Sequence, residues 1–196
     1  MRSLRQLRPT LFKYATIFAA AWALSAALRT FVGEWFVVPT SVMLPTIWPG
    51  DWLWVSKNFS EQDIHKGELV AHRTKMQPDR IALRRIVGLP GDSLKMISGR
   101  LWNMQGPLPF EEDPKQEGCG NEFLGELHYP ICLGSLPADS PALITLQGDE
   151  FAVAADHRTS VDFSPVFEII QRKDLYGVVT WGFRPKLRES IRIHGK

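Results

Sequence analysis

The string LRRIVGLPGDSL, residues 83–94, is the most informative stretch of this sequence. Its first half is rich in apolar and β-branched residues, which is typical of a buried strand. The Pro-Gly-Asp triplet that follows predicts a turn, because proline presets φ and glycine accepts a positive φ. The same triplet recurs at residues 49–51 and predicts a second turn.

Further short β-rich runs lie on both sides of this stretch, and Gly, Pro and Asp clusters separate them. Together they predict a mainly β protein built of coiled antiparallel sheets. Residues 106–141 hold several prolines and both cysteines, and we expect an irregular insertion there. The β-rich runs are residues 35–38, 51–56, 68–72, 81–89, 142–146, 151–155 and 175–183.

Length and composition limit the class of protein. A chain of 196 residues has room for one main core. With 44% hydrophobic and 22% charged residues and a mean hydropathy of -0.11, the chain is neither a disordered tail nor a multi-span membrane protein. A formal charge of +2 gives no support for a polyanionic partner, so nucleic acid is not expected.

The N-terminal segment has the charge pattern of a membrane-targeted chain. Residues 14–28 are fifteen uncharged residues, and as a helix they extend about 22 Å against a bilayer core of about 30 Å. Leu11, Phe12 and the aliphatic stems of Lys13 and Arg29 lengthen the apolar stretch. No acidic residue precedes Glu34, whereas cations stand at Arg2, Arg5, Arg8 and Lys13.

We therefore expect three parts: a cytoplasmic basic N-terminus at 1–13, a transmembrane anchor at 14–31 and an extracytoplasmic β domain at 32–196. This places a single-pass protein in the cytoplasmic membrane with its C-terminal domain on the outer face. A cleavable secretory signal is the alternative for the same N-terminal segment. Five aromatic residues follow it and predict either contact with lipid headgroups or a Trp-rich core, namely Trp35, Phe36, Trp48, Trp52 and Trp54.

Cys119 and Cys132 are thirteen residues apart in a Gly-containing stretch. In an exported domain a disulfide between them would contribute about 3 kcal/mol in the chain-entropy model. Two unrelated thiols are the equal alternative. The five histidines show no metal-ligand spacing, so we expect neither a metal nor a cofactor.

Three blocks of this sequence resemble type I signal peptidases, the membrane-anchored serine endopeptidases that remove signal peptides from exported proteins. PTSVMLPTIWPGDWLWVSK (39–57) and LRRIVGLPGDSL (83–94) resemble two blocks of that family, and FAVAADHRTSVDF (151–163) resembles its GDNR…SxDSR segment. RKDLYG (172–177) resembles the stretch that follows. The resemblance implies the signal-peptidase fold, with an N-terminal transmembrane helix.

The resemblance also implies that the catalytic dyad is substituted. In P-S-G-S-M-x-P-T the second Ser is the nucleophile, and this position is Val42 here. In K-R-x-x-G-x-P-G-D the Lys is the general base, and this position is Arg84. A Ser–Lys dyad needs a lysine whose pKa is lowered enough to accept the serine proton. Valine has no nucleophilic atom and a guanidinium stays protonated, so the dyad chemistry is not expected.

Other family positions are partly retained. Thr40 matches the Ser that assists the oxyanion hole, and Ser41 is the fallback nucleophile, although on an extended segment it would face away from the site. The third block supplies supporting residues, and we expect Asp162 to pair with Arg84 or Arg85. These supporting residues are Asp156, Arg158, Ser160 and Asp162.

Three functions follow from these observations. The first is a pseudoenzyme, at the surface of the membrane lipid, that binds signal-peptide-like segments or partners an active signal peptidase. The second is an active but divergent signal peptidase that uses Ser41 or an unrecognised nucleophile. The third is a membrane-attached structural or interaction domain.

Overall fold

The structure is a computed structural model, and it describes residues 3–60, 64–75, 79–134, 140–158 and 165–191. An N-terminal helix leads into a domain whose described residues are largely antiparallel strands, together with the 3-10 turn η2 (Arg172–Asp174). This confirms the mainly β fold expected from the sequence.

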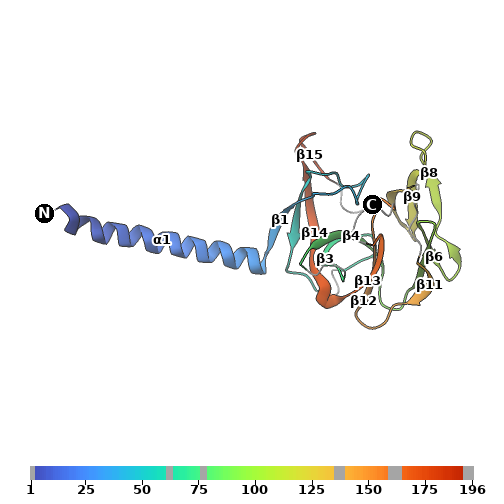
Figure 1. The fold of residues 1–196 in the computed structure, drawn as a ribbon, viewed down its shortest axis with the longest axis horizontal. Helices are drawn as coiled ribbons and strands as arrows, with labels where there is room; N and C mark the ends of the chain where they lie inside the picture. The colour runs from blue at the N-terminus through green and yellow to red at the C-terminus, as the bar shows by residue number, and fades with distance from the viewer. Residues whose placement is uncertain (1–2, 61–63, 76–78, 135–139, 159–164, 192–196) are drawn as a thin grey trace.

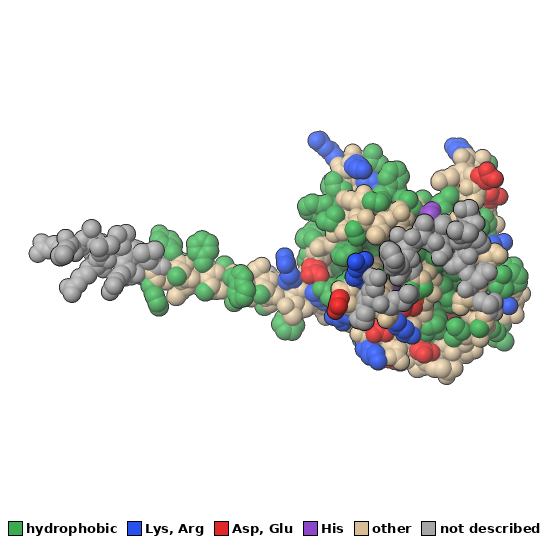
Figure 2. All heavy atoms as spheres, viewed as in Figure 1, with side chains coloured by type: hydrophobic (Ala, Val, Ile, Leu, Met, Phe, Trp, Pro, Cys, Tyr) green, Lys and Arg blue, Asp and Glu red, His purple; other side chains and the backbone are tan. Residues whose placement is uncertain are grey.

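Helix α1 (Ser3–Phe31) projects away from the β domain as one long rod (Figure 1). Apolar side chains line the helix without packing on the domain (Figure 2), and Phe12, Phe18 and Trp22 are each more than 70% exposed. Within the part of the chain that the structure describes, no helix reaches both the length and the hydropathy required of a membrane span.

The main sheet has eight strands in the order β1-β2-β14-β3-β4-β12-β13, and β15 pairs with β14. All of its strand pairs are antiparallel. The strand β14, near the end of the chain, lies between β2 and β3, so early and late segments are interleaved. The bounds are β1 (Gly33–Val37), β2 (Trp52–Ser56), β3 (Leu69–Arg73), β4 (Ile81–Gly88), β12 (Glu150–Ala154), β13 (Phe167–Gln171), β14 (Leu175–Arg184) and β15 (Glu189–Ser190).

Two smaller sheets form the other side of the domain (Figure 1). One has four strands in the order β11-β5-β6-β7, and the other has three in the order β10-β9-β8. The alternating burial of β5, in which Leu94 and Met96 point into the core, is what a half-buried strand requires. The bounds are β5 (Ser93–Ile97), β6 (Arg100–Asn103), β7 (Gly106–Pro107), β8 (Phe110–Glu112), β9 (Cys119–Leu124), β10 (Leu127–Cys132) and β11 (Ser140–Thr145).

The expectation of an irregular insertion at 106–141 was wrong for the described part of that stretch. Strands β9 and β10 form a hairpin in which Cys119 pairs with Cys132, and a disulfide joins the two residues. Gly125 turns the hairpin with φ at +71°. The proline content misled the sequence-based expectation, because Pro130 sits in β10, an edge strand where a missing N–H is tolerated.

The tryptophans after α1 do not form a buried core. Trp35 is 51% exposed and Trp52 is 46% exposed, and the ring of Trp35 contacts those of Trp52, Trp54 and Trp181. These four rings form an aromatic face on strands β1, β2 and β14 of the main sheet, next to the junction of α1 and β1. The buried core near this end instead consists of aliphatic residues that include Met43, Ile47, Leu53 and Leu83.

Candidate functional site

The first family-like block forms a closed loop between β1 and β2. The loop is closed at its base, because Val38 N–H donates to the Asp51 carbonyl at 2.9 Å and Gly50 N–H donates to the Val38 carbonyl at 2.8 Å. Gly50 has φ at +90°, as the predicted turn requires. The carboxylate of Asp51 accepts from Trp48 N–H at 2.8 Å and from Arg184 at 3.0 Å. The end of β14 therefore holds this loop in place.

The segment around Ser41 is a series of turns and not an extended strand. The expectation that Ser41 lies on an extended segment was therefore wrong. Leu44 N–H donates to the Ser41 carbonyl at 3.0 Å, and Ile47 N–H donates to the Met43 carbonyl at 2.8 Å. Strand alternation therefore does not decide where Ser41 points. Thr40 and Ser41 are both exposed, whereas Val42 is half-buried and Met43 fully buried.

Val42 has an apolar environment and one backbone contact across the site. Its side chain packs against the aliphatic cluster that includes Leu83. Its carbonyl accepts a hydrogen bond from His157 N–H at 3.0 Å. The first and third family-like blocks are thus brought together. The residue at the nucleophile position is a packing residue.

Arg84 is buried in β4, with 2% of its surface exposed. Its Nη1 donates to the Leu83 carbonyl at 2.8 Å and its Nη2 donates to the Pro165 carbonyl at 3.2 Å. A guanidinium is a donor only, and these acceptors match it. The side chain at the base position therefore has a hydrogen-bonding pattern opposite to that of a proton acceptor.

His72 lies on the same face of the sheet as Arg84, because Val70 pairs with Arg84 and His72 with Ala82 across β3 and β4. Its Nδ1–H donates to the Arg73 carbonyl at 3.1 Å, and its Nε2 is buried and has no partner among the described residues. The pKa of His72 is lowered from 6.5 to about 4, chiefly by burial. The hydrogen bond to the Arg73 carbonyl opposes this decrease, and the charge of Arg84 contributes to it. His72 is therefore neutral near pH 7.

Arg85 points away from Arg84 and forms a buried ion pair with Asp156. Its Nε donates to Asp156 Oδ1 at 2.8 Å, and its Nη2 donates to Oδ2 at 2.6 Å. Thr46 Oγ1 donates to the same Oδ2 at 2.5 Å. Burial disfavours the charged guanidinium, yet the Asp156 carboxylate outweighs this and raises the pKa of Arg85. Together with Thr46, the pair connects all three family-like blocks.

The expected partners Ser160 and Asp162 lie outside the described residues. The pairing of Asp162 with Arg84 or Arg85 therefore stays a prediction. The carboxylate bound to Arg85 in the described part of the chain is that of Asp156, for which the sequence predicts only a supporting role.

Arg158 extends these buried polar contacts into the disulfide-closed hairpin of β9 and β10. Its Nη2 donates to Glu122 Oε2 at 2.8 Å, and Tyr129 Oη donates to the same oxygen at 2.7 Å. Arg85 lies over the Tyr129 ring at 4.6 Å from its centroid. Burial raises the pKa of Tyr129 well above its usual value, and the nearby Glu122 carboxylate adds to this, so the phenol stays protonated as a donor.

Glu122 and Tyr129 were missed from the sequence because they lie in the stretch expected to be irregular. The available signal was local: Gly125 stands midway between two short runs of mixed polar and apolar residues that are bounded by the cysteines. No group of three or more His, Cys, Asp or Glu side chains suited to a metal ion is found among the residues that the structure describes.

The comparison with family models agrees with the resemblance of the three blocks. The sequence model of the family described as "Signal peptidase, peptidase S26" matches residues 11–182. The chain belongs to this family.

Individual relatives are distant. The chain is 26% identical over 117 residues to the signal peptidase I of Pseudomonas aeruginosa, a match that spans 53% of this chain but only 41% of that protein. It is 23% identical over 184 residues to the inactive signal peptidase IA of Staphylococcus aureus, covering 92% of this chain and 96% of the relative. Among solved structures, a signal peptidase I from Enterococcus faecalis matches with a TM-score of 0.39 at 18% identity, over 62% of this chain and all of the other.

Proposed function

We propose that this chain binds signal-peptide-like segments of exported proteins without hydrolysing them. The observation that carries the proposal is the pair of side chains at the two dyad positions: a packed valine, and a buried guanidinium already bonded to backbone carbonyls. Neither group can start or accept the proton transfer that peptide hydrolysis by a Ser–Lys dyad needs. A chain that keeps the family scaffold around such a pair is suited to recognising a peptide without cleaving it.

Peptide binding is supported by the geometry of the loop that carries residues 40–43. The loop is fixed at its base by Asp51 and Arg184, and at its inner side by the bond from His157 to Val42. Thr40 and Ser41 are exposed at its outer side. A bound peptide would therefore meet a surface at Thr40 and Ser41 that is already held in place, which lowers the entropy cost of binding.

We also propose that α1 anchors the protein in the cytoplasmic membrane, with the β domain on the outer face. Residues 14–28 carry no charge, and the exposed aromatic face of Trp35, Trp52 and Trp181 adjoins the point where the helix enters the domain. Indole rings favour the headgroup region. In this position the domain would meet signal peptides as they leave the membrane, beside any active signal peptidase with which it pairs.

The test uses the purified full chain in detergent or vesicles and a fluorescent peptide that carries a signal-peptide cleavage region. We expect saturable binding by anisotropy and no cleavage product by mass spectrometry. Cleavage that is lost in Ser41→Ala would overturn the proposal in favour of an active divergent peptidase. Absence of binding would favour a structural or interaction domain.

A further inference from the structure

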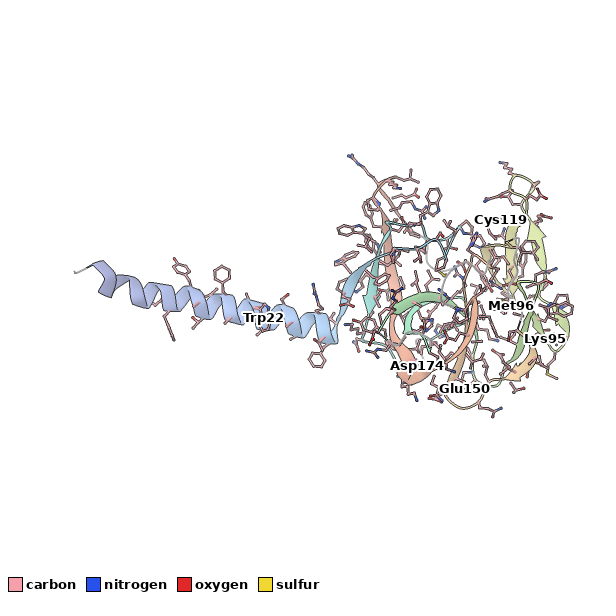
Figure 3. The ribbon with its side chains drawn as sticks, in the orientation of Figure 1. Trp22, Lys95, Met96, Cys119, Glu150 and Asp174 are labelled. Atoms are coloured by element: carbon pink, nitrogen blue, oxygen red, sulfur yellow. A yellow bond between two sulfur atoms is a disulfide. The ribbon has the colours of Figure 1, made fainter. Side chains whose placement is uncertain are left out.

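A disulfide between Cys119 and Cys132 joins β9 and β10 at the end of the hairpin opposite its turn. Cys119 is labelled in Figure 3. Both cysteines are largely buried. The turn before β9 is exposed, and it is tied to the strand ends because Asp113 N–H donates to the Cys119 carbonyl at 2.8 Å. The covalent bond thus fixes the position of Cys132, the last residue of β10.

Two backbone hydrogen bonds hold the third family-like block against Cys132. Its N–H donates to the Asp156 carbonyl at 2.9 Å, and its carbonyl accepts from Arg158 N–H at 2.7 Å. The residue between them, His157, forms an isolated parallel bridge with Cys132. His157 N–H then donates to the Val42 carbonyl at 3.0 Å. The disulfide is therefore connected with the loop at residue 42 in two steps, first from Cys132 to residues 156–158 and then from His157 to Val42.

A second connection runs through side chains of the same hairpin. Glu122, from β9, accepts from Arg158, and Tyr129, from β10, donates to Glu122. Arg158 also donates through Nη1 to the Gly99 carbonyl at 3.1 Å and through Nε to the Ala155 carbonyl. All three side chains are almost fully buried. Their geometry requires β9 and β10 to stay in register, and the disulfide holds this register at one end.

We propose that the disulfide-closed hairpin is a positioning element for the loop between β1 and β2 that carries Val42 (residues 38–51, called the Val42 loop). Peptide binding at this loop then depends on the bond between Cys119 and Cys132. His157 is the positioning residue that transmits the effect. This inference rests on the proposed function, since it names what controls that site. Reduction by a dithiol breaks the S–S bond, adds two electrons and two protons to give two thiols, and oxidises the dithiol to its own disulfide.

The first readout needs no peptide. Amide hydrogen exchange at His157 is compared between the oxidised full chain and the same chain treated with dithiothreitol. We expect reduction to lower the protection of the His157 amide, whose acceptor is Val42, while the Ile86 amide keeps its protection. Ile86 N–H donates to the Glu68 carbonyl at 2.8 Å within the main sheet, so it reports whether the fold is retained.

The second readout is affinity. We expect the labelled signal peptide to bind about tenfold more weakly to the reduced chain, within the range usual for coupling between two sites. The matched control is the double variant Cys119→Ser with Cys132→Ser, which should bind as weakly as the reduced protein and show no response to the dithiol. This control separates loss of the bond from any other effect of the reagent.

The possible outcomes separate this inference from the proposed function. Equal His157 protection and equal affinity in the oxidised and reduced chains would overturn the positioning role alone. Loss of protection at both His157 and Ile86 would show that the bond maintains the whole fold, which also overturns it. An oxidised chain that shows the expected exchange but binds no peptide supports the positioning role and rejects the proposed function.

Discussion

Arg85 and Asp156 face each other as a two-point ion pair, with Nε to Oδ1 at 2.8 Å and Nη2 to Oδ2 at 2.6 Å, and neither side chain is more than 2% exposed. Arg85 belongs to the strand before the Pro-Gly-Asp turn, and Asp156 to the segment that contacts the Val42 loop. The pair is therefore the central junction of the candidate site.

Breaking this pair from one side should destabilise the domain strongly. In Asp156→Asn the Arg85 guanidinium remains buried with a neutral amide, and we expect a loss of about 3–5 kcal/mol in unfolding free energy. Chemical denaturation of the full chain in detergent measures it. Arg85→Met combined with Asp156→Asn should cost less than the sum of the single variants, because no buried charge remains unpaired. Strict additivity would show that the two residues act independently.

Restoring the dyad should require both positions. We expect Val42→Ser with Arg84→Lys to gain measurable cleavage of a labelled signal peptide, and each single variant to gain little, because the nucleophile and the base act as a unit. Lysine can lose its proton in a buried position, which arginine cannot. Product formation measured by mass spectrometry decides the matter. Equal gain from Val42→Ser alone would show that another group takes the serine proton.

Replacing Ser41 should leave peptide binding intact, and we expect no peptide cleavage by either the parent chain or the variant. Ser41 is exposed on a turn, and its carbonyl closes that turn through Leu44 N–H. Ser41→Ala keeps this backbone contact and removes only the hydroxyl. We therefore expect an unchanged dissociation constant for the labelled peptide. The matched variant Thr40→Val, one residue earlier, tests whether a hydroxyl at the neighbouring position is needed for recognition.

Acid should destabilise the domain through His72. The folded-state pKa of about 4 lies below the ordinary value of 6.5, so the unfolded chain binds the proton more readily. Stability contributed by neutral His72 is present above pH 6.5 and is lost as the pH falls toward 4. The loss reaches about 3 kcal/mol at the lower end.

The control for this effect is His72→Phe, which keeps a ring of similar shape in the buried position. The difference in unfolding free energy between this variant and the parent chain should change with pH between 6.5 and 4 and be constant above this range. A difference that is constant throughout would show that His72 takes up its proton normally in the folded state. Subtracting the variant removes the contributions of the carboxylates, which also titrate in this range.

The parts of the fold that depend on local chemistry were predictable. The turn at Gly91, with φ at +93°, and the bond from Leu89 N–H to Asp92 Oδ2 at 2.7 Å are what Pro-Gly-Asp predicts. The resemblance to the family also implied that the third block supports the site. The structure shows the bond from His157 of this block to the carbonyl of Val42, a contact that the resemblance had not indicated.

The parts that depend on long-range pairing were not predictable. Glu122 and Arg158 are thirty-six residues apart, and nothing in either neighbourhood indicates the other. The same holds for Asp51 and Arg184, from opposite ends of the β domain. Proline was read as a sign of irregular chain in 106–141, although an edge strand accepts it. The order of the strands in a sheet decides which distant residues meet and which strands lie at an edge. A single sequence does not give that order.

The place of β14 in the middle of the main sheet sets the order in which the domain can be completed. Its neighbours β2 and β3 are made more than a hundred residues earlier. They are not paired with each other, because β14 (Leu175–Arg184) lies between them and pairs with both. A growing chain therefore emerges with a gap in its largest sheet. The Val42 loop, whose base is held by Arg184, acquires its final shape only after Arg184 itself has left the ribosome.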